Sequence, residues 1–305
     1  MFFYHGTNQK METRLCRTAG VEVLYRIVED AGVGSETIVC SGGLGGTHLI
    51  WSAVTRSLRN RYRLVIWDYP GLRAGETLPD HVEVDVPSLA GYLEAVLNAT
   101  GTDRAVLVGW SLGVQVAMEF ARLRADRLRG LITVCGLAGQ PFIDESSGDP
   151  LHAALSIQKS MPEALEWLSE RLERIDALRG MLRGIEHPTR WAKRFDLVDP
   201  HIDELVFDAV IRDFLALDPS LYNRYSQASA EHDAADILET LPFPVLAVAG
   251  ERDRFIRSVR VQEMVASIPR CEYFEVRGAT HYLPLEYGDL LALKIDEFIK
   301  KKIVP

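Results

Sequence analysis

The sequence has 305 residues but only four cysteines, and it contains no long apolar run. The cysteines, Cys16, Cys40, Cys135 and Cys271, show neither a CxxC pair nor the Cys/His spacing of a metal site. No run approaches the roughly 18 apolar residues of a membrane span. The opening MFFYHGTNQK lacks the basic and apolar regions of a signal peptide. We therefore expect buried free thiols and a cytoplasmic protein without stable membrane insertion.

Basic charge is also in short supply. The 34 Lys and Arg residues are outnumbered by 43 Asp and Glu residues, for a formal net charge of −9. This balance argues against a general nucleic-acid binder, which would carry a basic face. No metal-ligand constellation appears, and the segment GGLGG lacks the spacing and the downstream acid of a dinucleotide fingerprint. We expect no cofactor, no metal and no nucleic-acid partner, and a homodimer stays open.

Short apolar runs alternate with helical patterns over most of the chain. The strand-like runs are 13–17, 21–28, 37–40, 63–67, 105–108, 128–135, 244–249 and 272–276. The helix-like stretches are 49–58, 86–98, 112–123, 258–267 and 283–300. Short runs rich in Val, Ile and Leu, separated by helices, are typical of a parallel sheet that is buried on both faces. The pattern predicts the α/β class.

The alternation stops after residue 136, and residues 141–237 carry no convincing strand. A capping box with proline in the first turn, at 160–163, predicts a helix with an apolar stripe up to Leu178. A second helix is indicated from Val206 to Leu217, ending at Asp218 and Pro219. The sequence therefore predicts one α/β core interrupted by a helical insertion. The core comprises residues 1–140 and 238–305, and the insertion comprises residues 141–237.

A serine flanked by glycines stands between a predicted strand and a predicted helix, in the segment GWSLG at 109–113. A Gly-x-Ser-x-Gly turn in this position is a nucleophile elbow, which lifts the serine hydroxyl out at the carboxyl edge of the sheet. The turn is too tight for side chains two positions on either side of the serine. We expect Ser111 to be a nucleophile that faces the free N–H groups of the following helix. The alternative is a tight turn with a solvated serine.

A serine hydroxyl is a poor nucleophile near neutrality, so it needs a base, and the base needs an orienting acid. His281 follows the predicted strand 272–276 and precedes the last helix, which places it at the same edge. Asp253 follows the strand 244–249, one βα unit earlier. Glu251 competes for the acid role but stands too close to the strand end. The alternatives are a surface-loop histidine and a surface-turn aspartate.

The pattern of these residues resembles that of the α/β-hydrolase superfamily. The resemblance covers almost the whole chain. Their order, Ser111, Asp253 and His281, is the family's order of nucleophile, acid and base. The segment SGGLGGTHLIW at 41–51 looks like the family's oxyanion loop, and DYPGLRAGE at 68–76 looks like its Asp-x-x-Gly turn. The resemblance implies an α/β-hydrolase fold: a mostly parallel eight-stranded sheet flanked by helices. It also implies that the insertion at 141–237, which lies where the family carries its lid, is a helical lid, or cap.

Two departures from the family pattern stand out. The family often has His-Gly at the oxyanion loop, where this sequence has Gly42 and Gly43, so a loop-stabilising side chain is missing. The oxyanion donors that the resemblance implies are the backbone N–H groups of Leu44 and Leu112. The turn at 68–76 also lacks the usual Gly-x-Ser ending, a difference that we interpret as structural.

The identity of the residue at the elbow limits the kinds of hydrolase reaction that are expected. A serine there excludes the aspartyl-ester chemistry of related dehalogenases and epoxide hydrolases. Trp110 resembles the tryptophan of small-ester carboxylesterases with GWSLG elbows, and the alternative is that it only packs against the lid. Trp110 and Gly43 are the candidate substrate-binding residues.

We expect a serine hydrolase that cleaves a carboxylic ester, or a thioester, of a small to medium apolar acyl group through an acyl-enzyme intermediate. One alternative is another reaction on the same three residues, namely C–C bond hydrolysis, perhydrolysis or acyl transfer. The other is a non-catalytic ligand-binding protein on a hydrolase scaffold.

Overall fold

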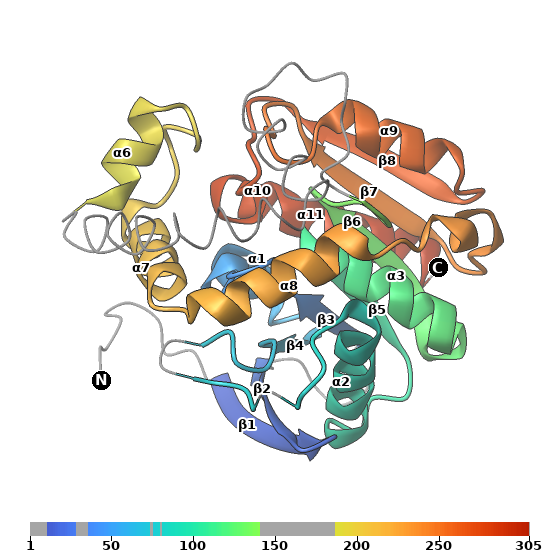
Figure 1. The fold of residues 1–305 in the computed structure, drawn as a ribbon. Coiled ribbons are helices and arrows are strands. Elements are labelled where there is room, and N and C mark those ends of the chain that lie inside the picture. The colour runs from blue at the N-terminus through green and yellow to red at the C-terminus, as the bar shows by residue number, and fades with distance from the viewer. Residues whose placement is uncertain (1–10, 29–35, 74–75, 80, 141–186, 305) are drawn as a thin grey trace.

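The computed structural model describes residues 11–28, 36–73, 76–79, 81–140 and 187–304 (Figure 1). An eight-stranded sheet lies at its centre, in the order β1-β2-β4-β3-β5-β6-β7-β8. The strands are β1 (Met11–Thr18), β2 (Val21–Val28), β3 (Thr37–Ser41), β4 (Arg63–Trp67), β5 (Ala105–Trp110), β6 (Leu128–Val134), β7 (Val245–Gly250) and β8 (Cys271–Val276). The pairings β1–β2 and β2–β4 are antiparallel, and the others are parallel. The predicted mostly parallel, eight-stranded sheet is confirmed.

Helices cover both faces of this sheet (Figure 1). Apolar residues of α2, α3 and α9 pack on one face, and those of α1 and α11 pack on the other. The larger core helices are α1 (Ser52–Leu58), α2 (Val86–Ala99), α3 (Leu112–Arg124), α9 (Ser258–Ala266) and α11 (Gly288–Lys302). Shorter helices are η1 (His48–Trp51), η2 (Ala125–Arg127), η3 (Ala235–Thr240) and α10 (Leu283–Glu286).

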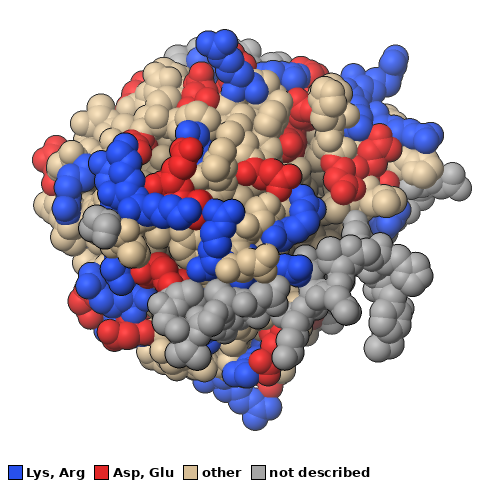
Figure 2. Space-filling view, turned by 180° about the vertical axis from the view of Figure 1, so that it is seen from behind, with Lys and Arg blue, Asp and Glu red and all other residues tan. Residues whose placement is uncertain are grey.

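The outer surface carries charges of both signs. On the face shown in Figure 2, acidic and basic side chains lie intermixed. Ion pairs also form along the helix 288–302, where Lys294 pairs with Glu297 at 2.7 Å and Lys300 pairs with Asp296 at 2.8 Å. This face therefore carries mixed charge rather than the basic field that attracts nucleic-acid phosphates.

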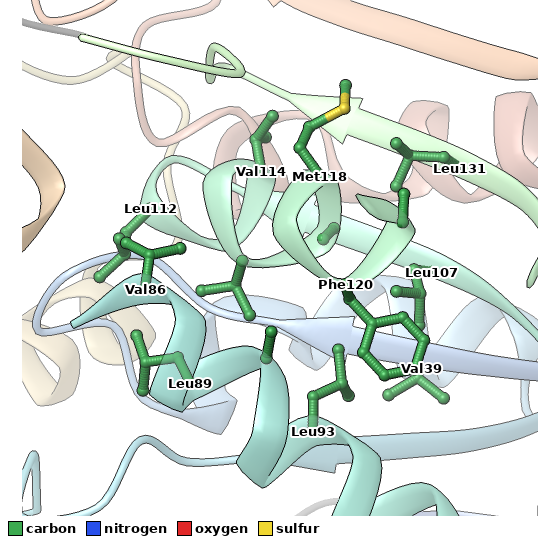
Figure 3. Close-up of a cluster of buried hydrophobic side chains, with 14 of the residues drawn as sticks. Val39, Val86, Leu89, Leu93, Leu107, Leu112, Val114, Met118, Phe120 and Leu131 are labelled. Carbon is green, nitrogen blue, oxygen red and sulfur yellow. The ribbon is translucent and has the colours of Figure 1, made fainter. Parts of the chain in front are cut away.

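The core has two layers because strand side chains alternate between the faces of the sheet. In β5, Leu107 points into the layer under α2 and α3, while Val106 and Val108 point into the layer under α1 and α11. Figure 3 shows Leu107 beside Phe120 from α3, with Leu93 from α2 in the same cluster, and all three are at most 1% exposed. Burial of each such side chain contributes ~1.5–3 kcal/mol. The continuous apolar runs of the sequence are thus explained by burial on both faces.

The four cysteines are all free. Cys40 and Cys135 are buried, as expected, whereas Cys16 and Cys271 are only partly buried. Burial raises the pKa of the Cys135 thiol well above its ordinary value, and the neighbouring Asp253 carboxylate raises it further. The buried thiols therefore stay protonated.

Two predicted core helices are divided in the structure. The predicted helix 49–58 consists of η1 followed by α1, and the predicted helix 283–300 consists of α10 followed by α11. The second break lies at Tyr287, whose backbone is not helical (φ −127°, ψ 34°). The chain is redirected there so that α11 packs closely on α1, and a Cβ atom added at Gly288 would lie 2.5 Å from Cβ of Ala53.

The described part of the predicted lid is helical. It contains α6 (Pro188–Arg194), α7 (Glu204–Leu215), α8 (Pro219–Glu231) and the start of η3. The helix predicted from Val206 is α7, and it ends at Leu215. Asp218 and Pro219, interpreted from the sequence as a helix end, instead begin α8: the Asp218 carboxylate accepts a hydrogen bond from the Leu221 N–H at 3.0 Å.

Residues just before the predicted insertion lie beside residues near its carboxyl end. Gly139 forms an isolated antiparallel bridge with Asp233, and the N–H of Gln140 donates to the carbonyl of His232 at 3.1 Å. The helix predicted at 160–178 lies outside the described residues. The division of the chain at 141 and 237 stays a prediction.

Candidate active site

Ser111 occupies a strained turn between β5 and α3. Its backbone has φ 56° and ψ −120°, a conformation that residues other than glycine rarely adopt. A Cβ atom at Gly109 would lie less than 3.0 Å from the carbonyl of Gly113, and one at Gly113 would lie equally close to the carbonyl of Ser41. Both glycines are therefore required by close backbone contact. The turn has the geometry expected of a nucleophile elbow.

A chain of hydrogen bonds runs from Ser111 to Asp253. Nε2 of His281 lies 3.0 Å from Oγ of Ser111, and Nδ1 of His281 lies 2.8 Å from Oδ2 of Asp253. The three residues follow β5, β7 and β8, whose carboxyl ends lie at the same edge of the sheet. The structure thus brings together the three residues that the sequence singled out.

The Asp253 carboxylate is held in place from its other oxygen. Oδ1 accepts hydrogen bonds from the N–H groups of Phe255 and Ile256, both at 2.9 Å. The Asp253 side chain is fully buried, and that of His281 is 10% exposed. This buried carboxylate, with two backbone donors and an imidazole partner, is fully hydrogen-bonded, and its orientation toward His281 is therefore fixed.

Glu251 points elsewhere. Its Oε2 accepts a hydrogen bond from the N–H of Gly278 at 2.8 Å, on the exposed side of the loop that follows β8. The competing acid considered from the sequence therefore holds the loop that leads to His281, and Asp253 is the carboxylate in contact with the imidazole.

Trp110 supports the histidine, a contact that the sequence analysis missed. Its indole N–H donates a hydrogen bond to the carbonyl of His281 at 2.8 Å, and the two ring centroids lie 5.3 Å apart. Trp110 also lines the cavity above Ser111. The two residues are 171 positions apart in the chain, so no local pattern could have indicated the contact.

The loop after β3 lies beside the serine. A Cβ atom added at Gly43 would lie 2.9 Å from Cβ of Ser111, so the loop backbone reaches the serine only because residue 43 is glycine. Leu44 from this loop and Leu112 from the start of α3 both line the cavity. Their roles as backbone N–H donors to an oxyanion stay predictions, as does a substrate contact at Gly43.

A cavity of about 320 Å³ opens above Ser111 and His281. Aliphatic and aromatic side chains from the loop after β3, from α7 and from the loop after β7 form much of its wall; among them are Leu44, Val210, Ile211, Phe214, Phe255 and Ile256. Gln115, Ser226 and Ser229 add uncharged polar groups between α3 and α8. His281 is the one titratable side chain other than tyrosine among the described residues that line this cavity.

The described residues hold no group of three or more His, Cys, Asp or Glu side chains that could bind a metal ion. In the same part of the chain, every helix is too short or too polar to cross a bilayer.

A model of the alpha/beta hydrolase family matches residues 38–292, a range that includes the elbow, Asp253 and His281. The chain belongs to this family. The α/β hydrolase is similar in fold to the solved enol-lactonase from Burkholderia xenovorans LB400, with a TM-score of 0.72 and 18% identity over 94% of this chain and 100% of that chain. At this identity the likeness concerns the fold alone.

Two curated proteins illustrate the range of its relatives. The polyketide synthase ThaQ of Burkholderia thailandensis is 25% identical over 278 residues, which are 87% of this chain but only 12% of the synthase. The pimeloyl-(acyl-carrier protein) methyl ester esterase of Aeromonas hydrophila is 27% identical over 259 residues, which are 83% of this chain and 91% of the esterase. The α/β hydrolase thus spans a small part of the first relative and most of the second.

Proposed function

We propose that this α/β hydrolase is a serine hydrolase that cleaves a carboxylic ester through an acyl-enzyme intermediate. The observation that carries the proposal is the continuous hydrogen-bond chain from Asp253 through His281 to Ser111, at the floor of a largely apolar cavity. A nucleophile, a base within hydrogen-bond reach and an orienting acid are what acyl transfer from an ester requires.

The proposed reaction has two halves. Oγ of Ser111 attacks the ester carbonyl while Nε2 of His281 takes the hydroxyl proton, and the carbonyl electron pair moves onto the oxygen. The C–O bond to the alcohol then breaks, and His281 returns the proton to the leaving alkoxide. In the second half, a water molecule attacks the acyl-enzyme in the same way and releases the acid and free Ser111.

Asp253 and two backbone N–H groups have supporting roles in this scheme. Asp253 holds the proton on Nδ1 of His281, so that Nε2 is free to accept, and it stabilises the imidazolium that forms. The N–H groups of Leu44 and Leu112 are the proposed donors to the oxyanion. Each such donor is worth ~10²–10³ in rate in a well-studied serine hydrolase.

The size and the apolar walls of the cavity favour a substrate with an uncharged acyl group of small to medium size. Its volume of about 320 Å³ lies at the lower end of the usual range for small-molecule sites. The apolar walls from α7 and from the loop after β7 would bury a hydrocarbon chain, while a charged group would lose its hydration there without a described partner of opposite charge.

A second candidate is a substrate carried on a larger molecule, either an ester on a carrier-bound acyl chain or a thioester. The Aeromonas relative is a pimeloyl-(acyl-carrier protein) methyl ester esterase, and the similarity to it supports the first form. C–C bond hydrolysis, perhydrolysis and acyl transfer use the same three side chains and stay alternatives, as does ligand binding without turnover.

Turnover of p-nitrophenyl esters from acetyl to dodecanoyl tests the proposal, with Ser111→Ala as the control. We expect hydrolysis by the wild type, with a preference within the series, and loss of nearly all activity in the variant. A fluorophosphonate probe should label wild-type protein at Ser111. Labelling at another residue would contradict the nucleophile assignment, and an unlabelled, folded protein without turnover would favour the non-catalytic alternative.

A further inference from the structure

The loop after β3 contains few side chains that could stabilise its conformation. Four of the five residues at 42–46 are glycine, and Gly45 has a positive φ of 74°. Glycine restricts the backbone less than any other residue, so such a loop is costly to order. Gly42, at the start of the loop, has no side chain that could stabilise it. A loop that presents the Leu44 N–H to an oxyanion must therefore be held by groups outside it.

Contacts within and beneath the loop set the plane of its peptides. The N–H of Gly46 donates to the carbonyl of Gly43 at 3.0 Å. Because the Gly43 carbonyl and the Leu44 N–H belong to one planar trans peptide, this bond directs the N–H to the opposite side. The Trp110 ring fills the space beneath, where a Cβ atom at Gly46 would lie 2.6 Å from it.

A tyrosine hydroxyl holds the preceding peptide. The Tyr69 O–H donates to the carbonyl of Gly42 at 2.6 Å, between residues that are 27 positions apart. Tyr69 follows the carboxyl end of β4 and is 4% exposed. Burial raises the pKa of its phenol well above the ordinary value, so the hydroxyl keeps its proton and remains a donor.

The Tyr69 ring is itself fixed on two sides. It meets Trp67 edge-on, with centroids 4.9 Å apart, and it stacks on Tyr225 from α8 at 6.2 Å with an interplanar angle of 21°. Tyr225 is 1% exposed, and its ring alone makes the contact with Tyr69, whereas its hydroxyl donates to the carbonyl of Pro70 at 2.9 Å, outside the loop at 42–46. The Tyr69 hydroxyl is thus held rigidly against the loop by packing that does not depend on the hydrogen bond itself.

We propose that Tyr69 is a positioning residue of the oxyanion site: its hydroxyl holds the Gly42 carbonyl, and through it the Gly43–Leu44 peptide whose N–H meets the developing oxyanion. Tyr69 thereby stabilises from outside a loop whose glycines provide no side chains of their own. The inference rests on the proposed function, because it assigns Tyr69 a part in stabilising the tetrahedral intermediate.

Tyr69→Phe tests this, and Tyr225→Phe is a matched control. Each change removes one buried hydroxyl that donates to a backbone carbonyl and keeps the stacked ring, but only Tyr69 contacts the oxyanion loop. We expect Tyr69→Phe to lower kcat for a p-nitrophenyl ester by about tenfold to a hundredfold, less than removal of an oxyanion donor itself, with KM little changed. Tyr225→Phe should leave both constants close to those of the wild type.

Inhibition by a hexyl trifluoromethyl ketone provides a measurement that would not change if Tyr69 only stabilised the fold. Oγ of Ser111 adds to its carbonyl, the serine proton passes to His281, and the resulting oxyanion occupies the donor site without a leaving group. The inhibition constant should rise in Tyr69→Phe by the same factor by which kcat falls, and it should stay unchanged in Tyr225→Phe. Hexanol, which forms no oxyanion, should inhibit all three proteins equally.

Each rate is divided by the concentration of active sites, which is measured by titration with a fluorophosphonate. Misfolded protein therefore does not enter the comparison. Equal values of kcat and of the ketone inhibition constant in Tyr69→Phe and Tyr225→Phe would overturn the inference. A change in KM alone, with an unchanged inhibition constant for the ketone, would overturn it as well. Failure of the proposed function is recognised separately, by turnover in Ser111→Ala or by labelling at another residue.

Discussion

Ser111 shows how one residue in an unfavourable conformation is held by its surroundings. Its positive φ would ordinarily cost ~1–3 kcal/mol. The Ser111 N–H donates to the carbonyl of Val134 at 3.0 Å, and its carbonyl accepts from the N–H of Val114 at 2.9 Å. These bonds connect the turn to β6 and to the first turn of α3. The strained conformation is therefore maintained by the sheet and the helix together.

At the same scale, Asp253 and Glu251 form a natural pair of test positions. In Asp253→Asn, the side-chain oxygen can still accept from the Phe255 and Ile256 N–H groups, but the amide nitrogen faces Nδ1 of His281. That favours the tautomer with the proton on Nε2, which cannot accept from Ser111. We expect kcat for a p-nitrophenyl ester to fall by up to ~10⁴-fold, the loss seen in the best-studied serine triad.

Glu251→Gln is the control for this change. The amide oxygen of glutamine can accept the same hydrogen bond from the Gly278 N–H, so kcat should stay near the wild-type value. The opposite pattern, with a crippled Glu251→Gln and a mild Asp253→Asn, would move the acid role to Glu251.

At the scale of elements, α8 is tied to the helix that begins at the nucleophile. Nε2 of Gln115 in α3 donates to the carbonyl of Ser229 at 2.8 Å, and the Ser229 hydroxyl donates to Oε1 of Gln115 at 2.6 Å. Both residues are buried, at 2% and 4% exposure. The pair fixes α8 against α3 on the side of the cavity.

Ser229→Ala should therefore weaken the docking of α8 on α3. The change leaves the buried Oε1 of Gln115 without its donor, which costs about 1–3 kcal/mol in the free energy of unfolding. Ser226→Ala removes a hydroxyl of the same helix that lines the cavity, and it should change stability by less than about 0.5 kcal/mol. Urea unfolding of the two variants measures the difference, and equal losses would show that the Gln115–Ser229 pair contributes nothing specific.

At the scale of the whole molecule, His48 links stability to pH. Burial lowers the pKa of His48 from 6.5 to about 3, and the positive charge of Arg26 contributes to the shift. The unfolded chain therefore binds a proton that the folded protein excludes between these values. The stability contribution of neutral His48 is complete above pH 6.5 and is lost as the pH falls from there toward about 3.

His48→Gln should flatten this pH dependence. The wild type is expected to lose up to about 2 kcal/mol through this one residue between neutral pH and about pH 5. Urea unfolding from neutral pH down to about pH 5 measures the slope, with His81→Gln as the control because His81 is exposed. A slope that is the same in His48→Gln and in the wild type would contradict the assignment.

The sequence by itself determined those features of this α/β hydrolase that depend on local pattern. The sequence predicted all eight strands to within a few residues, and the central strands β3, β4, β5, β6 and β7 are apolar because they are buried on both faces of the sheet. It also singled out Ser111, Asp253 and His281, since the carboxyl ends of parallel strands share one edge and chain order alone then places their loops together. Their side chains do lie within hydrogen-bond distance of one another in that order.

Only the tertiary structure decided how distant segments hold the site. Helix α8 has a polar sequence, PSLYNRYSQASAE, and is stabilised by its contacts with Gln115 and Tyr69 rather than by a strong apolar stripe. The break at Tyr287 likewise follows from the packing of α11 on α1. The bonds from Trp110 to His281 and from Tyr69 to Gly42 join residues far apart in the chain. Such contacts depend on how the chain folds back on itself, and sequence periodicity records only which side of an element is buried, not which residue it meets.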